Sequence, residues 1–91
     1  MAMIAVWLKI DEKRVVPALQ EAGTKLGGAE GEVVLDFSAV RRIDPGALRA
    51  MEEFAGIADA KSVKVVLRGL NIDAYKVLKL VKLAPRFLYV S

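Results

Sequence analysis

Four short runs rich in β-branched and aromatic residues, separated by stretches with helical periodicity, constrain the fold of this chain more than any other feature. The runs are residues 4–8, 33–35, 63–67 and 87–90. Residues 33–35 are apolar throughout, as expected of a strand covered on both faces. About 30 residues separate this run from the next, which is the spacing of a right-handed βαβ unit with parallel strands. The sequence therefore predicts one α/β domain over residues 1–91, with about four strands in a mostly parallel sheet and about three helices.

The stretch between the first two runs has the spacing of an amphipathic helix that ends at Gly27 and Gly28. Its start is open. Asp11 is a good N-cap, but a start there puts Pro17 at the sixth helical position, where proline removes a hydrogen bond. A start close to Pro17 is the alternative. The predicted buried residues of this helix are Val15, Ala18, Leu19, Ala22 and Leu26.

The second helix has the clearest start in the chain. Asp44 is a favourable N-cap residue, and Pro45 fits the first helical position because its missing N–H has no partner there anyway. The predicted buried stripe consists of Leu48, Met51, Phe54, Ala55 and Ala58. The predicted solvent face carries Arg49, Glu52, Glu53 and Asp59.

The third helix is predicted to start at Asn71, after Gly69 ends the preceding strand, and to end at Pro85. We expect Ile72, Tyr75, Leu78 and Val81 to point inward, and Lys76, Lys79 and Lys82 to point outward. Trp7 and Tyr89 lie in the terminal strands, and we expect both rings to be packed.

Catalysis has little to rest on in this sequence. The chain has no cysteine and no histidine, which excludes thiolate nucleophiles, Ser-His-Asp triads and the usual zinc ligands. Asp36 and Asp44 form the best candidate carboxylate pair, without a base or metal partner beside them. We therefore predict a protein that is not an enzyme and that needs no cofactor or metal.

Residues 36–48, which read DFSAVRRIDPGAL, resemble the central motif of the STAS domain family. The motif is a strand that ends in an Asp-apolar-Ser-x-Val turn, followed by an Ile-Asp-x-x-x-Leu helix start. The resemblance continues at residues 17–19 and 69–71 and covers nearly the whole chain. This family includes anti-sigma-factor antagonists, the cytoplasmic ends of sulfate transporters and a subunit of lipid-asymmetry ABC transporters. The resemblance implies an α/β domain that works by binding another protein.

The resemblance also implies a functional site at the start of the second helix. Phosphorylation-regulated relatives usually read Asp-Ser-Ser-Gly-Leu or Asp-Thr-Gly-Gly-Leu there, and a partner kinase phosphorylates the first hydroxyl. A phosphate at a helix N-terminus is locally favourable, but it adds roughly −1.5 to −2 charge to the interface. Here the aligned residue is Pro45, which cannot accept a phosphate. The hydroxyls of Thr24, Ser38, Ser62 and Ser91 do not align with this position.

The resulting hypothesis is a regulatory STAS domain in the cytoplasm, resembling an anti-sigma-factor antagonist but lacking the phosphorylatable residue. The implied partner is an anti-sigma factor of the histidine-kinase-like ATPase type. The alternative is an accessory STAS subunit that docks on the ATPase of a lipid-transport ABC transporter. The third helix, which contains Tyr75, slightly favours this alternative. The predicted partner-binding residues are Asp36, Ser38, Arg41, Arg42, Asp44, Pro45, Gly46, Arg49, Glu52 and Glu53.

Charge is distributed unevenly along the chain. Residues 1–60 carry seven basic and ten acidic side chains, whereas residues 61–91 carry seven basic side chains and one acidic. A basic face of this kind can bind an acidic protein, an anionic lipid surface or nucleic acid. A nucleic-acid binder is therefore the second alternative, although exposed aromatics or a recognisable groove helix are not evident.

Two departures from the family pattern bear on self-association. Only one apolar segment precedes the first helix, where relatives often have two strands, and no helix follows residues 87–90. We expect a sheet edge or an apolar face to be less covered than usual, which favours a homodimer. The longest apolar run is too short to span a bilayer.

Overall fold

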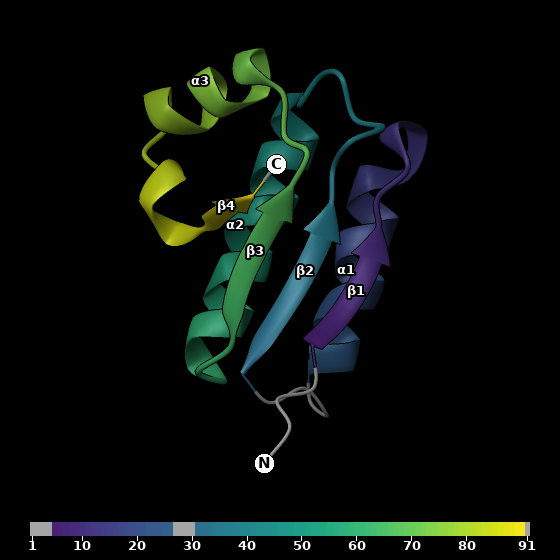
Figure 1. Ribbon diagram of the computed structural model, residues 1–91, viewed down its shortest axis with the longest axis vertical. Coiled ribbons are helices and arrows are strands. Elements are labelled where there is room, and N and C mark those ends of the chain that lie inside the picture. The colour runs from purple at the N-terminus through teal and green to yellow at the C-terminus, as the bar shows by residue number, and fades with distance from the viewer. Residues whose placement is uncertain (1–4, 27–30, 91) are drawn as a thin grey trace.

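The computed structural model describes residues 5–26 and 31–90 and contains one four-stranded sheet (Figure 1). The strands are β1 (Ala5–Lys9), β2 (Glu32–Asp36), β3 (Lys64–Arg68) and β4 (Leu88–Val90). They lie in the order β1-β2-β3-β4, and each neighbouring pair is parallel. The predicted α/β class with a parallel sheet is confirmed. Ile4, predicted to begin the first strand, lies outside the described residues.

Three α-helices connect the strands: α1 (Val15–Lys25), α2 (Pro45–Ala60) and α3 (Ile72–Leu80). Each connection moves one strand along the sheet in the same direction. Right-handed crossovers of that kind place their helices on the same face of a sheet. Figure 1 shows α1 and α2 behind the strands, with α3 beside the C-terminal ends of β3 and β4. Two short 3-10 helices, η1 (Glu12–Arg14) and η3 (Ala84–Arg86), precede α1 and β4.

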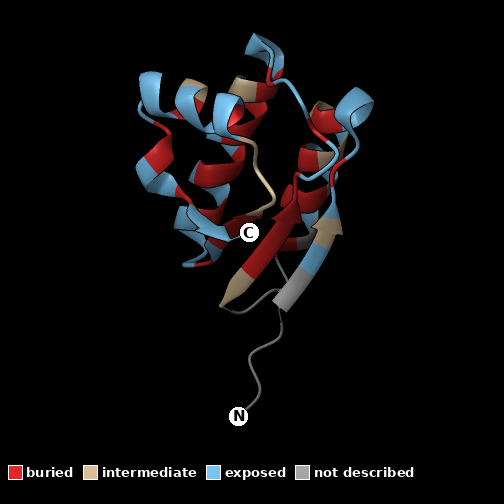
Figure 2. Cartoon of the chain, turned by 45° about the horizontal axis from the view of Figure 1, so that its top comes forward, coloured by how far each residue is buried: buried red, intermediate tan, exposed pale blue. Residues whose placement is uncertain are grey.

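The core fills the space between the helices and one face of the sheet (Figure 2). Alternate strand residues point into it because successive side chains of a strand face opposite ways. The strands contribute Val33, Leu35, Val65 and Leu67, and Phe37 follows directly after β2; each is buried. The helices contribute Leu19, Ala22, Met51, Phe54, Ala55, Ala58, Ala74 and Leu78.

The start of α1 combines the two starts that the sequence left open. The carboxylate of Asp11 accepts from the N–H of Lys13 at 2.9 Å and caps η1, and α1 itself begins at Val15. Pro17 is thus the third residue of α1, where the backbone N–H of an ordinary residue would still lack a helical partner. Gly27 and Gly28, predicted to end this helix, lie outside the described residues.

Two predictions for α3 were wrong. The helix ends at Leu80 rather than at Pro85, because Lys82 adopts a left-handed conformation with φ 63° and the N–H of Leu83 returns to the Leu78 carbonyl at 2.9 Å. Its buried side chains are Ala74 and Leu78, whereas Ile72, Tyr75 and Val81 are exposed. The physical reason is that this nine-residue helix packs through one narrow side only.

The two terminal-strand aromatics differ from each other. Trp7 was predicted to be packed, yet 55% of it is exposed. Tyr89 does pack in part. Its ring meets that of Tyr75 edge to face at 5.2 Å, and its hydroxyl donates to the Ala84 carbonyl at 2.6 Å. Burial, with a smaller effect of Tyr75, raises the pKa of Tyr89 to about 12.

Candidate protein-binding surface

The segment between β2 and α2, residues 37–44, is held in place from both sides, and we call it the β2–α2 loop. Its hydrophobic anchors are Phe37, Val40 and Ile43, which are buried. On one side the N–H of Arg41 donates to the Glu12 carboxylate at 2.6 Å. On the other side the amide nitrogen of Asn71 donates to the Arg41 carbonyl at 2.9 Å and to the Val40 carbonyl at 3.3 Å. These contacts fix the backbone of a loop whose other side chains are exposed.

Asn71 performs two tasks with one side chain. Its amide oxygen accepts from the N–H of Ala74 at 2.7 Å, which caps α3 as predicted. Its amide nitrogen makes the two loop contacts, which the sequence did not indicate. The residue thereby couples the start of α3 to the backbone that leads into α2.

The start of α2 is built as the sequence predicted. The carboxylate of Asp44 accepts from the N–H of Ala47 at 2.7 Å, and its carbonyl accepts from the N–H of Leu48 at 2.9 Å. Pro45 occupies the first helical position and is exposed. Pro45, which the motif resemblance predicts to stand in place of a phosphorylated hydroxyl, is thus at the surface next to a filled N-cap.

Asp36 differs from the other predicted partner-binding residues because it is buried. Its carboxylate accepts from the backbone N–H of Ser38 at 2.9 Å and lies 3.7 Å from the guanidinium of Arg68. Hydrogen bonds from Ser38 hold the pKa of Asp36 below its ordinary value, and the positive charges of Arg68 and Lys9 add to this against the effect of burial. Asp36 therefore holds the start of the β2–α2 loop through the backbone of Ser38 and does not belong to the exposed surface. Since Asp44 caps α2, the two carboxylates serve separate structural contacts rather than an acid–base pair.

Gly69 lies directly against Ser38, the residue whose backbone N–H donates to Asp36. Its φ is +70°, and a β-carbon added there would lie 2.9 Å from Cβ and 3.1 Å from Cα of Ser38. Only glycine fits such a close backbone approach without displacing the β2–α2 loop. The glycine of the Gly-Leu-Asn motif at residues 69–71 therefore has a structural role, which the sequence alone did not indicate.

The remaining predicted residues are exposed and lie on the β2–α2 loop and on α2 as far as Glu53. They belong to one continuous chain segment and carry both positive and negative charges. They are Ser38, Arg41, Arg42, Asp44, Pro45, Gly46, Arg49, Glu52 and Glu53. We call these nine residues the loop–helix surface.

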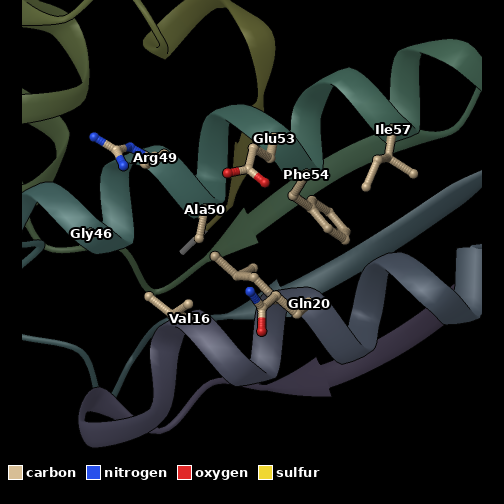
Figure 3. A pocket seen from close by; sticks show the side chains of 9 residues that line it. Val16, Gln20, Gly46, Arg49, Ala50, Glu53, Phe54 and Ile57 are labelled. Carbon is tan, nitrogen blue, oxygen red and sulfur yellow. The ribbon is translucent and has the colours of Figure 1, made fainter.

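A groove of about 270 Å³ between α1 and α2 extends the loop–helix surface (Figure 3). The ring of Phe54 points from α2 toward α1, and Val16 and Gln20 lie on the facing helix. Gly46, Arg49 and Glu53 line the groove as well. Sequence reasoning missed the part played by α1. The signal available was that Val16 and Gln20 are one turn apart and flank the buried stripe.

The basic residues of the C-terminal third do not form one face. Lys64 and Arg68 lie on the sheet, whereas Lys76 and Lys79 lie on α3. Arg86 is paired with Asp59 at 2.6 Å. Within residues 5–26 and 31–90, no group of three His, Cys, Asp or Glu side chains could hold a metal ion. Among the helices of these residues, none is both long and apolar enough to cross a membrane.

Comparison with known proteins places the chain within a family. A family model described as STAS domain matches residues 5–90. A crystal structure of a candidate anti-sigma factor antagonist from Thermotoga maritima has a similar fold, with a TM-score of 0.77 and 15% sequence identity. The likeness covers 99% of this chain and 84% of that one. Comparison with curated protein sequences finds no significant match.

Proposed function

This chain belongs to the STAS domain family, and from that premise we propose that it is a non-enzymatic regulatory domain that binds a partner protein through the loop–helix surface. The observation that carries the proposal is the arrangement of this surface. Nine exposed polar or turn-forming residues lie on the β2–α2 loop, whose backbone Glu12 and Asn71 hold at residues 40 and 41, and on the part of α2 that follows it. A surface ordered before binding loses less conformational entropy when a partner docks.

The proposed partner is an anti-sigma factor of the histidine-kinase-like ATPase type, and the proposed place of action is the cytoplasm. The family resemblance and the fold of the Thermotoga maritima protein support this class of partner. The charges of the surface specify the partner further. Arg41 and Arg42 require acidic groups opposite the loop, whereas Glu52 and Glu53 require basic groups opposite α2. The apolar groove beside Phe54 accepts a hydrophobic side chain.

Binding is proposed to be independent of phosphorylation. Pro45 occupies the position where phosphorylated relatives carry a hydroxyl, and it is exposed at the first turn of α2. A phosphate there would add negative charge beside Asp44 at the centre of the proposed interface. Without the hydroxyl, abundance of the protein or a change in the partner controls the complex.

The test uses two substitutions at Pro45 and a purified anti-sigma factor of this type from the same organism. Pro45→Glu places a carboxylate at a helix start, where it changes stability by only about 0.5 kcal/mol. We expect it to weaken binding at least tenfold in calorimetry, because the charge enters the interface. Pro45→Ser should bind as the natural protein does and should become phosphorylated by the partner with ATP, whereas the natural protein should not.

Equal binding by all three proteins would show that this helix start is only a cap and would overturn the proposal. Phosphate found at Ser38 of the natural protein by mass spectrometry would overturn the phosphorylation-independent part. Circular dichroism and thermal unfolding of each variant serve as the folding control.

A second candidate function rests on α3. Its outer side exposes Ile72 and Leu80 (70% and 82% exposed) beside Lys76 and Lys79. Such a surface fits the alternative in which the domain docks on the ATPase of an ABC transporter. Lys79→Glu reverses one charge on this side of α3, just as Pro45→Glu adds one at the start of α2. If binding to a transporter ATPase is lost with Lys79→Glu but not with Pro45→Glu, this candidate is favoured. Recovery of nucleic acid alone from a native lysate would favour the basic-face alternative instead.

A further inference from the structure

The sheet has a second face that the described helices do not cover. Because neighbouring strands pair in register, Trp7, Val34, Val66 and Leu88 form one row across all four strands on this face. Val34 and Val66 are 8% and 5% exposed, yet neither belongs to the core cluster on the helix side. At the two ends of the row, Trp7 and Leu88 are 55% and 51% exposed. We call this row the apolar stripe.

The indole ring of Trp7 contacts the guanidinium of Arg68 on this face. The guanidinium carbon of Arg68 is 5.2 Å from the ring centroid, although β2 separates the strands of these two residues. The Arg68 and Trp7 side chains together therefore span the width of β2 on this face. Trp7 is still 55% exposed, so part of the indole remains accessible to a second molecule.

Charged residues flank the apolar stripe in an ordered way. The two β2 residues that flank Val34 on this face, Glu32 and Asp36, are acidic. Their in-register partners on β3, Lys64 and Arg68, are basic. One central strand of the face is therefore negative at both ends, and the other is positive at both ends.

We propose that this face binds a second copy of the same chain, related by a two-fold axis parallel to the strands and midway between β2 and β3. That operation lays β2 of each copy over β3 of the other. Glu32 then faces Lys64 of the second copy. The Asp36–Arg68 ion pair within each copy, in which Asp36 is buried, lies opposite the same pair of the other copy with the charges reversed. Along the apolar stripe, Val34 faces Val66 of the second copy and Trp7 faces its Leu88. The interface is self-complementary, as a two-fold dimer requires.

The charges also select this axis among the alternatives. A two-fold axis along the stripe would lay β2 over β2, so that Glu32 faces Asp36 and Lys64 faces Arg68. Like charges face each other throughout that arrangement, which costs binding energy. The aligned arrangement agrees with the way twisted sheets pack face to face, with their strands within about 30° of each other.

The footprint is small, so the dimer is weak. Four short strands offer less than the roughly 800 Å² per partner of a standard interface, and we expect a dissociation constant of about 10–100 µM. The helices lie on the opposite side of each sheet. The loop–helix surface of both copies therefore stays free in the dimer, and this inference does not depend on the proposed function.

Trp7 is the single tryptophan of the chain and lies in the proposed interface, so its fluorescence reports association directly. We expect the emission maximum to move to shorter wavelength as concentration rises through the dissociation constant. Sedimentation equilibrium should show a monomer–dimer transition over the same range. A protein that stays monomeric at about 1 mM, well above the expected constant, would overturn the inference.

Two charge reversals identify the face. E32K and K64E each place like charges opposite one another in their own dimers, and we expect each to weaken dimerisation at least tenfold. An equal mixture of the two should dimerise, because every reversed residue then faces its opposite charge in the other copy. The double variant E32K/K64E should dimerise by itself.

The control for charge is K79E, which makes the same change as K64E but on α3, and it should dimerise as the natural protein does. Far-ultraviolet circular dichroism checks that each variant is folded. A dimer that survives both single reversals, or a mixture that stays monomeric while each variant is folded, would overturn this face as the interface.

Discussion

At the scale of single residues, Asp36 has the most consequential environment. It is the one charged residue that is buried among those the structure describes. Its carboxylate contacts the backbone of Ser38 and the guanidinium of Arg68, and Gly69, the residue after β3, lies against Ser38. This small group of residues joins the ends of β2 and β3 to the start of the β2–α2 loop.

The lowered pKa of Asp36 predicts an acid dependence of stability. A carboxyl whose pKa is lower in the folded state than in the unfolded state stabilises the fold above its ordinary pKa of 3.8 and loses this effect as the pH falls through the folded value. Asp36→Asn keeps the shape and one acceptor but removes the charge. We expect it to lower the free energy of unfolding by about 1–2 kcal/mol at pH 7.

Urea denaturation at pH 7 and at about pH 3 measures this effect, since both variants can be compared at each pH. The difference between Asp36→Asn and the natural protein should shrink at the acidic pH. A difference that is the same at both pH values would contradict the assigned role of the Asp36 charge.

Two glycines provide a matched pair of substitutions. Gly69→Ala must force a methyl group to 2.9 Å from Ser38 and hold a non-glycine residue at φ +70°, so we expect a loss of about 1–3 kcal/mol. Gly56→Ala lies on the exposed side of α2 with nothing within 4 Å of the added carbon. It should stabilise the protein by about 0.5–1 kcal/mol. Thermal unfolding of both variants tests the prediction, which is contradicted if the two shifts have the same sign.

At the scale of elements, the contacts that matter most join one element to the next. The β2–α2 loop is attached to η1 through Glu12 and to α3 through Asn71. Helix α1 comes close enough to α2 that a β-carbon on Gly23 would lie 3.3 Å from Ile57. The groove beside Phe54 is the space that remains between these two helices.

The two tasks of Asn71 can be separated by substitution. Asn71→Asp keeps the oxygen that caps α3 but loses the N–H donors to Val40 and Arg41. Asn71→Ala loses both. We expect Asn71→Asp to leave α3 intact and Asn71→Ala to lower the stability by about a further 1 kcal/mol.

Amide hydrogen exchange distinguishes the two effects. Both variants should exchange faster in residues 39–43, whereas only Asn71→Ala should exchange faster at the first turn of α3. Unchanged exchange of residues 39–43 in Asn71→Asp would show that the two donor contacts do not order the loop. In that case the loop–helix surface would owe its order to Glu12 and to the buried Val40 and Ile43.

At the scale of the whole molecule, the two proposed surfaces lie on opposite sides. The helices cover one face of the sheet, and the apolar stripe crosses the other. The chain is therefore expected to bind a partner and a second copy at the same time, without either blocking the other.

This separation predicts that variants affect one association each. Pro45→Glu should weaken partner binding and leave the monomer–dimer equilibrium within about twofold, because about 0.5 kcal/mol is the largest effect expected of a charge at a distant helix end. Lys64→Glu should do the reverse. Calorimetry with the partner and sedimentation equilibrium of the domain measure the two associations independently. A variant that abolishes both while remaining folded would show that the surfaces are coupled.

The local determinants of the fold could be read from the sequence. The β-branched runs define the four strands, and Asp44, Pro45 and Asn71 define two helix starts, because these signals act between residues close in the chain. The exposed residues of the loop–helix surface were named for the same reason, since they follow a motif of consecutive residues. Pro45 in place of a hydroxyl was evident without any structure.

What only the tertiary structure decided depends on residues far apart in the chain. Periodicity marked Ile72, Tyr75 and Val81 as buried, but α3 packs through Ala74 and Leu78, and a hydrophobic pattern does not say how much of a helix its neighbours cover. Asp36 was predicted to bind a partner, but the structure buries it beside Arg68, which lies opposite it only because β2 and β3 pair in register. The uncovered face of the sheet, with acidic residues on β2 and basic residues on β3, exists for the same reason. Strand order and register are set by packing across the whole sheet, and they determine which side chains share a face.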